Sequence, residues 1–233
     1  MAQESKGPRP RDSVKVAVFD IDGTITDCRR ALVLECVEAI RELQESGVVC
    51  MIVSGNVLPV AMGVASAAGI RGPVVGENGG MIHYEGQVTR LRDSRVAFQA
   101  FENLRSAMEV REIVTNRWRE VEVGILPEVP LEEVQDHIRG FDVWAGSTGF
   151  AHHIMPTGVD KATGLSAALE MLGLGPEDCV AFGDHQTDIP MMEMAALSGA
   201  PAQAEPEVRA IATWVAEREY GHGTADLIRE HLL

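Results

Sequence analysis

Two aspartates, Asp20 and Asp22, directly follow an apolar run and are followed in turn by Gly23 and Thr24. The run, residues 14–19, has the composition of a short buried strand, so both carboxylates are expected at its carboxyl end, where open α/β sheets bind ligands. Carboxylates at i and i+2 form a compact negative pocket that suits a divalent cation, and one of them can act as a nucleophile. Because the same pattern also makes simple turns, it needs partners elsewhere in the chain.

Three further polar stretches follow apolar, strand-like runs or begin a helical pattern. They are Ser54-Gly55-Asn56, Lys161, and residues 183–188 with Asp184 and Asp188. Because the carboxyl ends of adjacent parallel strands lie side by side, groups far apart in sequence can converge there. Together they supply a nucleophile, oxygen ligands for Mg²⁺, a cation, and a hydroxyl with backbone N–H donors. Phosphoryl transfer from an ester requires this set of groups.

The segments that must position these residues alternate between strands and helices. The expected strands and helices of this kind are at 14–19, 31–43, 48–53, 59–68, 73–75, 160–172 and 179–182. Strands separated by helices of this length indicate parallel β-α-β units. Residues 1–80 and 156–233 are therefore predicted to form one α/β core, a Rossmann-like parallel sheet with helices on both faces.

The middle of the chain, residues 81–155, has a different pattern. A hairpin is expected at 81–90, and two helices and three more strands follow it. Hairpins mixed with helices indicate a small α+β unit inserted into the core. Such a unit can close over the strand ends, exclude water and select the substrate, with hinges near 79–80 and 156–158.

Composition limits the partners that this chain is expected to bind. The formal net charge of −15 argues against a nucleic acid, but a metal ion and one or two cations can still attract an anionic small molecule. The four cysteines form no C-x-x-C pair and are expected to be reduced core residues. Residues 1–13 lack the apolar segment of a signal peptide, and no run approaches the ~20 apolar residues of a membrane span. These features predict a cytoplasmic protein without a membrane partner.

The order of these motifs resembles that of the haloacid dehalogenase superfamily of phosphohydrolases, and the insert resembles that superfamily's cap. The chain is similar in particular to the archaeal-type phosphoglycolate phosphatases. The stretches that carry this similarity are 53–57, 76–80, 115–120 and Tyr220-Gly221. The resemblance covers nearly the whole chain from about Val14. It implies a Mg²⁺-dependent phosphoric monoester hydrolase that converts 2-phosphoglycolate to glycolate and phosphate through an aspartyl-phosphate.

The resemblance also implies a role for each carboxylate. Asp20 is the expected nucleophile and a ligand of Mg²⁺. Asp22 is expected to protonate the leaving oxygen, to take a proton from the attacking water later, and to lend its main-chain carbonyl to the metal. For that work Asp22 is expected close to the leaving group and not buried in an ion pair. Asp184 and Asp188 match the other acidic metal positions.

The remaining core motifs are expected to hold the phosphate. By the same resemblance, Ser54 and the N–H groups of Gly55 and Asn56 would bind its oxygens, and Lys161 would neutralise charge on the phosphate and the nucleophile. Taken singly, Ser54 would more often make a plain turn or a helix N-cap, and Lys161 would more often be a solvated helix residue. The ordered set favours the functional interpretation.

Phosphoglycolate carries an extra carboxylate, so its binding calls for a cation from the insert. Arg117 and Arg119 are the candidates, since a guanidinium can pair bidentately with a carboxylate. An alternative has equal weight: Trp118 packs in the core of the insert, and an arginine pairs with Glu120 or Glu122.

Two stretches that contain histidine are not explained by the motifs above. His152 and His153 would face opposite sides of a strand, so a satisfied or exposed pair is expected rather than a metal site. His185 and Thr187 stand where many members of the superfamily have a small residue and an asparagine, so the support of the second metal carboxylate is expected to differ.

Two other functions remain open from the sequence. One is a sugar-phosphate phosphatase, or a phosphatase of many small phosphomonoesters, since side chains of the insert set specificity. The other is a phospho-acceptor signalling domain, which does not explain Asp22 two residues after the nucleophile or an insert of this size. A monomer and a homodimer are both compatible with the sequence.

Overall fold

The computed structural model describes residues 13–148 and 150–233 of the chain. The expectation that no signal peptide is present concerns residues 1–13, which lie almost entirely outside the described part. Among the helices that are described, none combines the length and the apolar character needed to cross a bilayer.

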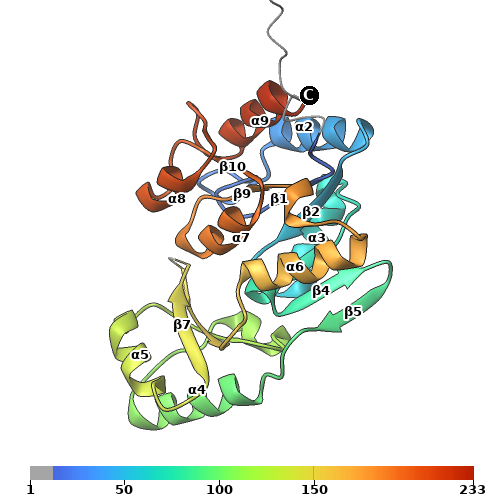
Figure 1. Ribbon diagram of the computed structural model, residues 1–233. Coiled ribbons are helices and arrows are strands. Elements are labelled where there is room, and N and C mark those ends of the chain that lie inside the picture. The colour runs from blue at the N-terminus through green and yellow to red at the C-terminus, as the bar shows by residue number, and fades with distance from the viewer. Residues whose placement is uncertain (1–12, 149) are drawn as a thin grey trace, which may run out of the picture.

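The larger part of the molecule is built on one eight-stranded sheet (Figure 1). Its strands, in spatial order, are β11 (Trp214–Val215), β10 (Leu197–Ala200), β9 (Cys179–Phe182), β1 (Val16–Phe19), β2 (Val49–Val53), β3 (Val74–Gly76), β4 (Met81–Tyr84) and β5 (Gln87–Arg90). Every pair from β11 to β3 is parallel, and only the last two pairs are antiparallel. Strand β1 therefore lies inside the sheet, between β9 and β2.

Successive residues of the central strands point to opposite faces of the sheet. In β1, Ala17 and Phe19 pack in one apolar cluster, and Val16 and Val18 pack in the other. The first face is covered by α2 (Leu34–Glu45), α3 (Leu58–Ala68) and α9 (Tyr220–His231), and the second by α6 (Lys161–Leu172), α7 (Ile189–Met194) and α8 (Pro206–Ile211). The predicted α/β class, a mostly parallel sheet with helices on both faces, is confirmed.

Helix α6 begins at Lys161 because the preceding residue caps it. The side chain of Asp160 accepts a hydrogen bond from the N–H of Thr163 at 2.7 Å, which satisfies one of the free donors of the first turn. Gly173 ends the helix in the left-handed conformation, with φ 66°. The cap fixes the start of the helix and therefore the position of Lys161.

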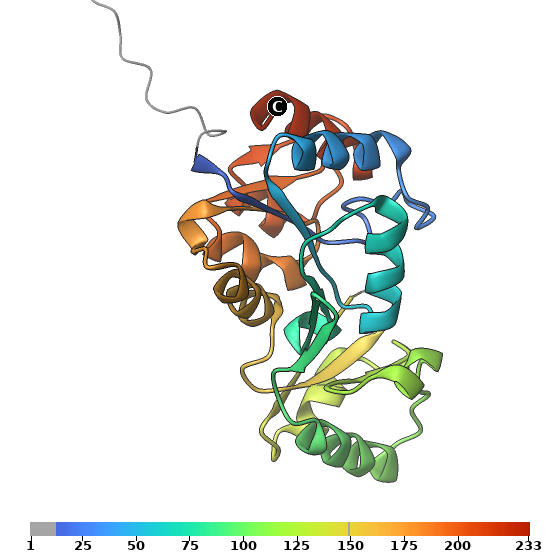
Figure 2. The same cartoon turned by 90° about the vertical axis from the view of Figure 1, so that its right-hand side faces the viewer.

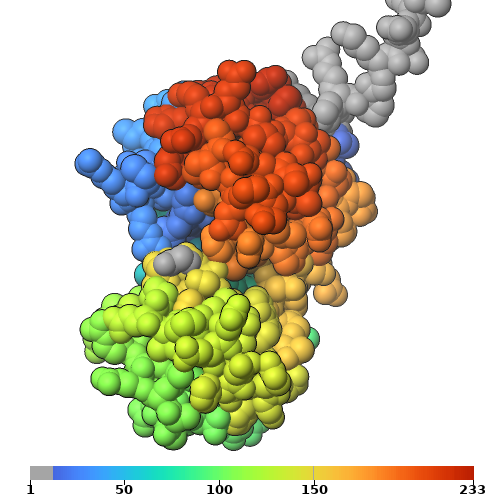
Figure 3. All heavy atoms as spheres, turned by 90° about the vertical axis from the view of Figure 1, so that its left-hand side faces the viewer, coloured from blue at the N-terminus to red at the C-terminus, as the bar shows by residue number. Residues whose placement is uncertain are grey.

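The inserted part has its own sheet and its own core (Figure 2). Strands β6 (Val123–Ile125), β8 (His152–Pro156) and β7 (Val143–Ser147) form an antiparallel sheet in that order. Helices α4 (Arg95–Ala107) and α5 (Leu131–Ile138) pack against it, with Leu104 and Val134 of the helices in one apolar cluster with Ile154 of β8. The space-filling view shows the insert as a separate lobe below the core (Figure 3).

The hairpin β4–β5 differs from the expectation that placed residues 81–155 in the insert. Strand β4 pairs antiparallel with β3, with Met81 opposite Gly76, so the hairpin extends the core sheet. The short apolar stretch of β4 indicates a strand but not the sheet that it joins, and burial of Met81 and Ile82 against core residues decides the pairing. We therefore propose that the insert comprises residues 91–156.

Candidate active site

The carboxyl ends of β1, β2 and β9 bring three of the four polar segments together. Phe19 lies in register with Ile52 of β2 and Phe182 of β9, so the residues that follow each strand meet at one edge of the sheet. Asp20 and Ser54 follow β1 and β2 directly, and Asp184 lies two residues beyond β9. The sequence-based expectation of convergence at this edge agrees with this placement.

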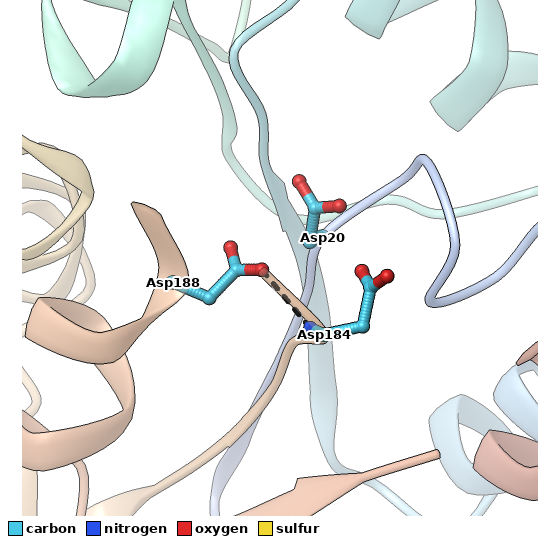
Figure 4. A group of neighbouring side chains, drawn as sticks. All are labelled: Asp20, Asp184 and Asp188. Carbon is cyan, nitrogen blue, oxygen red and sulfur yellow. Dashed lines mark hydrogen bonds between the residues drawn. The ribbon is translucent and has the colours of Figure 1, made fainter. Parts of the chain in front are cut away.

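Three carboxylates form a tight group at this edge (Figure 4). One oxygen of each of Asp20, Asp184 and Asp188 lies within 4.8 Å of the others. Asp188 ends the 3-10 helix η4 (Gln186–Asp188), and its Oδ2 accepts hydrogen bonds from the N–H groups of Asp184 and His185, both at 3.0 Å. These bonds fix the loop after β9 and hold Asp184 toward Asp20.

Lys161 lies between two of these carboxylates. Its Nζ is 2.6 Å from Oδ1 of Asp20 and 2.5 Å from Oδ1 of Asp188, and all three side chains are buried. Burial lowers the pKa of Lys161, but Asp188 and Asp20 outweigh it and hold that pKa above its ordinary value. Lys161 is therefore charged at neutral pH.

One lysine does not balance the negative charge of the group. Burial raises the pKa of Asp20 well above its ordinary value, and the charges of Asp188 and Asp184 add to the rise although Lys161 opposes it. Burial, and next the charge of Asp188, raise the pKa of Asp184 to about 7, against hydrogen bonds from Thr24 Oγ1 (3.0 Å) and Gln203 Nε2 (3.3 Å). Clustered carboxylate oxygens with too little positive charge fit a hard divalent cation.

The raised pKa of Asp184 makes a prediction for the metal-free protein. The pKa of an aspartate in the unfolded chain is ~4. Between that pH and about 7, Asp184 therefore holds a proton in the folded protein that it has lost in the unfolded chain. Stability must therefore fall as the pH rises through this window. We expect the thermal midpoint in EDTA to show this fall and Asp184→Asn to remove part of the slope. An unchanged slope in the variant would contradict the assignment.

Asp22 is partly exposed and makes two polar contacts. Its Oδ2 accepts a hydrogen bond from Nδ2 of Asn56 at 2.8 Å, and its Oδ1 lies 3.0 Å from Nε of Arg30. From the sequence, Asp22 was expected not to be buried in an ion pair. It does pair with Arg30, but its side chain is 28% exposed, so the pair is accessible to solvent. The partnership with Arg30 was not foreseen from the sequence.

The segment after β2 forms a compact loop closed by hydrogen bonds between its own residues. Oγ of the buried Ser54 accepts hydrogen bonds from the N–H and from Nδ2 of Asn56, both at 3.1 Å. Its own hydroxyl proton is then free to donate. On the opposite side, the carbonyl of Gly55 accepts from both terminal nitrogens of Arg119 at 3.3 Å. The loop is thereby held between the core and the insert.

The two arginines expected to bind substrate are engaged elsewhere. Arg119 is 7% exposed and pairs with Glu122, which corresponds to one of the alternatives considered above, and burial lowers its pKa to about 10. The guanidinium of Arg117 lies 5.0 Å from the ring centroid of Trp118, and that ring is 51% exposed rather than in the core of the insert. Neither arginine is among the described residues that line the cleft over Asp20.

The histidines of β8 are buried and belong to the structure of the insert. His152 Nε2 lies 2.9 Å from the carbonyl of Val129, and His153 lies 3.0 Å from both Glu122 and Thr148. Burial, and next the charges of Arg119 and Lys161, lower the pKa of His153 to about 3, so this ring is neutral at ordinary pH. The expectation of a satisfied side chain fits His153, while Nδ1 of His152 has no hydrogen-bond partner among the described residues.

His185 and Thr187, which differ from the residues that many members of the superfamily have at these positions, contact each other. Nδ1 of His185 is 3.4 Å from both the N–H and the hydroxyl of Thr187, and Nε2 lies 3.3 Å from Glu205. This contact does not involve the backbone N–H groups of Asp184 and His185, which donate to Oδ2 of Asp188. His185 and Thr187 are both among the described residues that line the cleft.

A cleft of about 410 Å³ opens above this group. Its described lining includes most of the predicted site residues: Asp20, Asp22, Ser54, Gly55, Asn56, Lys161 and Asp184. Asp188 lies behind Lys161 and is fully buried. Arg30, Phe150 and Tyr220 also line the cleft, and sequence reasoning did not assign them to it.

Known proteins resemble this chain over nearly its full length. A family model of haloacid dehalogenase-like hydrolases matches residues 17–115 and 127–228. A phosphoglycolate phosphatase of Methanothermobacter thermautotrophicus is 37% identical over 94% of this chain and 99% of its own length. That of Methanopyrus kandleri is 36% identical over 93% and 97%. A crystal structure of a Thermoplasma acidophilum protein, 28% identical, superposes with a TM-score of 0.88 over 94% of this chain and 99% of its own.

Proposed function

Since the chain belongs to the haloacid dehalogenase-like hydrolases, we propose that it is a Mg²⁺-dependent phosphatase that hydrolyses 2-phosphoglycolate to glycolate and phosphate. The observation that carries the chemistry is the meeting of Asp20, Asp184, Asp188 and Lys161 at one edge of the sheet. The substrate is inferred from relatives named phosphoglycolate phosphatase, which match this chain over more than nine-tenths of their length.

The reaction proceeds in two displacements at phosphorus. A carboxylate oxygen of Asp20 forms a bond to phosphorus while the bond to the ester oxygen breaks, and Asp22 gives its proton to that oxygen, which leaves as glycolate. A water molecule then attacks phosphorus and gives a proton to Asp22, and the bond to Asp20 breaks to release phosphate. Lys161 holds Oδ1 of Asp20 in place, so the attacking group is oriented before the substrate arrives.

The other groups hold the transferring phosphoryl oxygens. Ser54 donates its hydroxyl, Gly55 offers its backbone N–H, and Lys161 supplies positive charge. The N–H of Asn56, expected from the sequence to join them, is donated instead to Oγ of Ser54. Asp20, Asp184 and Asp188, with the main-chain carbonyl of Asp22, would hold Mg²⁺. Bound there, the ion would neutralise charge on the phosphoryl oxygens.

The test is steady-state phosphate release from 2-phosphoglycolate and a panel of hexose phosphates, with Mg²⁺ or with EDTA. We expect turnover of phosphoglycolate to require Mg²⁺ and its kcat/KM to exceed that of each hexose phosphate. Turnover in EDTA equal to that in Mg²⁺ would refute the metal-assisted mechanism. Equal kcat/KM across the panel would refute phosphoglycolate as the preferred substrate and favour a phosphatase of many small esters. A single stoichiometric burst without turnover would favour a phospho-acceptor domain.

We also propose that the enzyme works in the cytoplasm. All four cysteines are free, and Cys28 is exposed beside the cleft. An exposed thiol next to an active site is best preserved in a reducing compartment.

A further inference from the structure

A tight loop beside the cleft presents one arginine, Arg30. The side chain of Asp27 accepts hydrogen bonds from the N–H groups of Arg29 (2.8 Å) and Ala31 (2.9 Å), and the N–H of Arg30 donates to the carbonyl of Asp27 at 2.9 Å. Arg30 itself has φ 65°, a conformation that a residue with a Cβ adopts only where its surroundings impose it. The backbone therefore fixes the direction from which this side chain enters the site.

The guanidinium of Arg30 bridges the core and the insert. Its Nε lies 3.0 Å from Asp22, and its central carbon lies 4.4 Å from the ring centroid of Phe150, which belongs to the insert. The ring of Phe150 in turn meets His153 edge to face, with centroids 5.9 Å apart. A guanidinium placed over an aromatic ring is attracted to the face of the ring, and its N–H groups can still form hydrogen bonds.

Arg30 is the accessible strong cation of the cleft. The other one in its described lining, Lys161, is buried and already contacts two carboxylates. The side chain of Arg30 is 50% exposed, and Asp22 is its acidic partner among the described residues. Because a guanidinium has five N–H donors, the contact through Nε leaves the terminal nitrogens available to a ligand.

The position of Arg30 matches the part of the substrate that distinguishes phosphoglycolate from other phosphate esters. Asp22 must lie next to the leaving oxygen to give it a proton, and in phosphoglycolate a single methylene separates this oxygen from the carboxylate. A cation in contact with Asp22 is therefore within reach of that carboxylate.

We propose that Arg30 is the specificity-determining residue of this enzyme, which binds the substrate carboxylate through its terminal nitrogens while Phe150 supports the guanidinium. The inference rests on the proposed function, because it assumes that the leaving group carries a carboxylate. It takes this role from Arg117, which lies over Trp118, and from Arg119, which is buried against Glu122 and the carbonyl of Gly55.

The test compares 2-phosphoglycolate with ethyl phosphate, which has the same number of carbons but no carboxylate. In Arg30→Gln, kcat/KM for phosphoglycolate is expected to fall by about 10- to 100-fold, the loss of charge-assisted hydrogen bonds, while that for ethyl phosphate changes by less than about 3-fold. Arg30→Lys should retain part of the preference, since it keeps the charge without the planar fork. Arg29→Gln, in the same loop but exposed and outside the cleft lining, is the control and should behave as wild type.

The outcomes separate this inference from the proposed function. Equal losses for both substrates in Arg30→Gln would show that Arg30 acts through Asp22 or the fold, and an undiminished preference would show that another group binds the carboxylate. Either result overturns the role of Arg30 while the preference of the wild type stands. If the wild type itself does not prefer phosphoglycolate to ethyl phosphate, the proposed substrate is overturned, and the inference with it.

Discussion

Replacing Asp20 by asparagine is expected to lower kcat for 2-phosphoglycolate by at least about 10⁴-fold, because an amide oxygen cannot form the bond to phosphorus that the carboxylate forms. The side chain keeps its size and still offers a carbonyl oxygen to Nζ of Lys161, now 2.6 Å from Oδ1. The loss should therefore fall on kcat with little change in the fold. Phosphate release in a single-turnover assay measures it.

The same variant is expected to be at least as stable as the wild type without metal. Burial, and next the charges of Asp188 and Asp184, raise the pKa of Asp20, so its ionised form destabilises the folded state above the pKa of the unfolded chain. The neutral amide removes that cost at neutral pH. Adding Mg²⁺ should raise the thermal midpoint of the wild type more than that of Asp20→Asn, because the variant has lost an anionic ligand.

An exposed aspartate of the insert provides the control. Asp136 pairs with Arg139 on the surface and is 65% exposed, so Asp136→Asn should leave kcat and the response to Mg²⁺ unchanged. Turnover by Asp20→Asn within about 10-fold of wild type would refute a covalent aspartyl-phosphate, since loss of a nucleophile is far more costly.

The carboxylates of the site could be predicted because each lies at a point where the local sequence is unambiguous. Asp20 follows β1 at once, and Asp184 follows β9 after a single glycine, and both strands are apolar runs buried on both faces. Parallel pairing then leaves no choice about the edge at which they meet. Lys161 is equally well determined, because Asp160 is a strong helix cap directly before it.

The specificity residues could not be predicted in the same way. Arg30 lies in a loop without periodicity, and its role depends on Phe150, which is 120 residues away and on the other lobe. Arg119 has the right chemistry for a carboxylate, but its burial beside Glu122 follows from packing between the lobes. A pattern of residue types indicates which groups can bind an anion, and only the tertiary contacts show which of them remains free.

Replacing Lys161 by methionine is expected to lower both the stability and the activity of the protein, whereas Asp20→Asn lowers activity alone. Methionine is about as long as lysine and can be buried in its place, but Asp20 and Asp188 would then have lost their opposite charge. The side chains of Lys161, Asp20 and Asp188 are only 3%, 7% and 0% exposed, respectively. Breaking a buried pair in this way costs about 3–5 kcal/mol. Denaturant unfolding in EDTA at neutral pH measures the loss, and kcat should fall by roughly 10³-fold, the scale of lost electrostatic stabilisation at one site.

Two further measurements on Lys161→Met, its stability as a function of pH and its combination with a second substitution, show whether unpaired charge causes the loss of stability. Lys161 has a raised pKa in the folded protein, so its stabilising effect is fully present at neutral pH and is lost only as the pH rises past the ordinary pKa of a lysine. Acidification should restore stability to Lys161→Met, because protonation of Asp20, whose pKa burial raises, removes one of the unpaired carboxylate charges. Asp20→Asn should stabilise Lys161→Met by more than it stabilises the wild type, since it removes one of two charges that have lost their partner. Additive effects of the two substitutions would instead show that the damage is a packing defect.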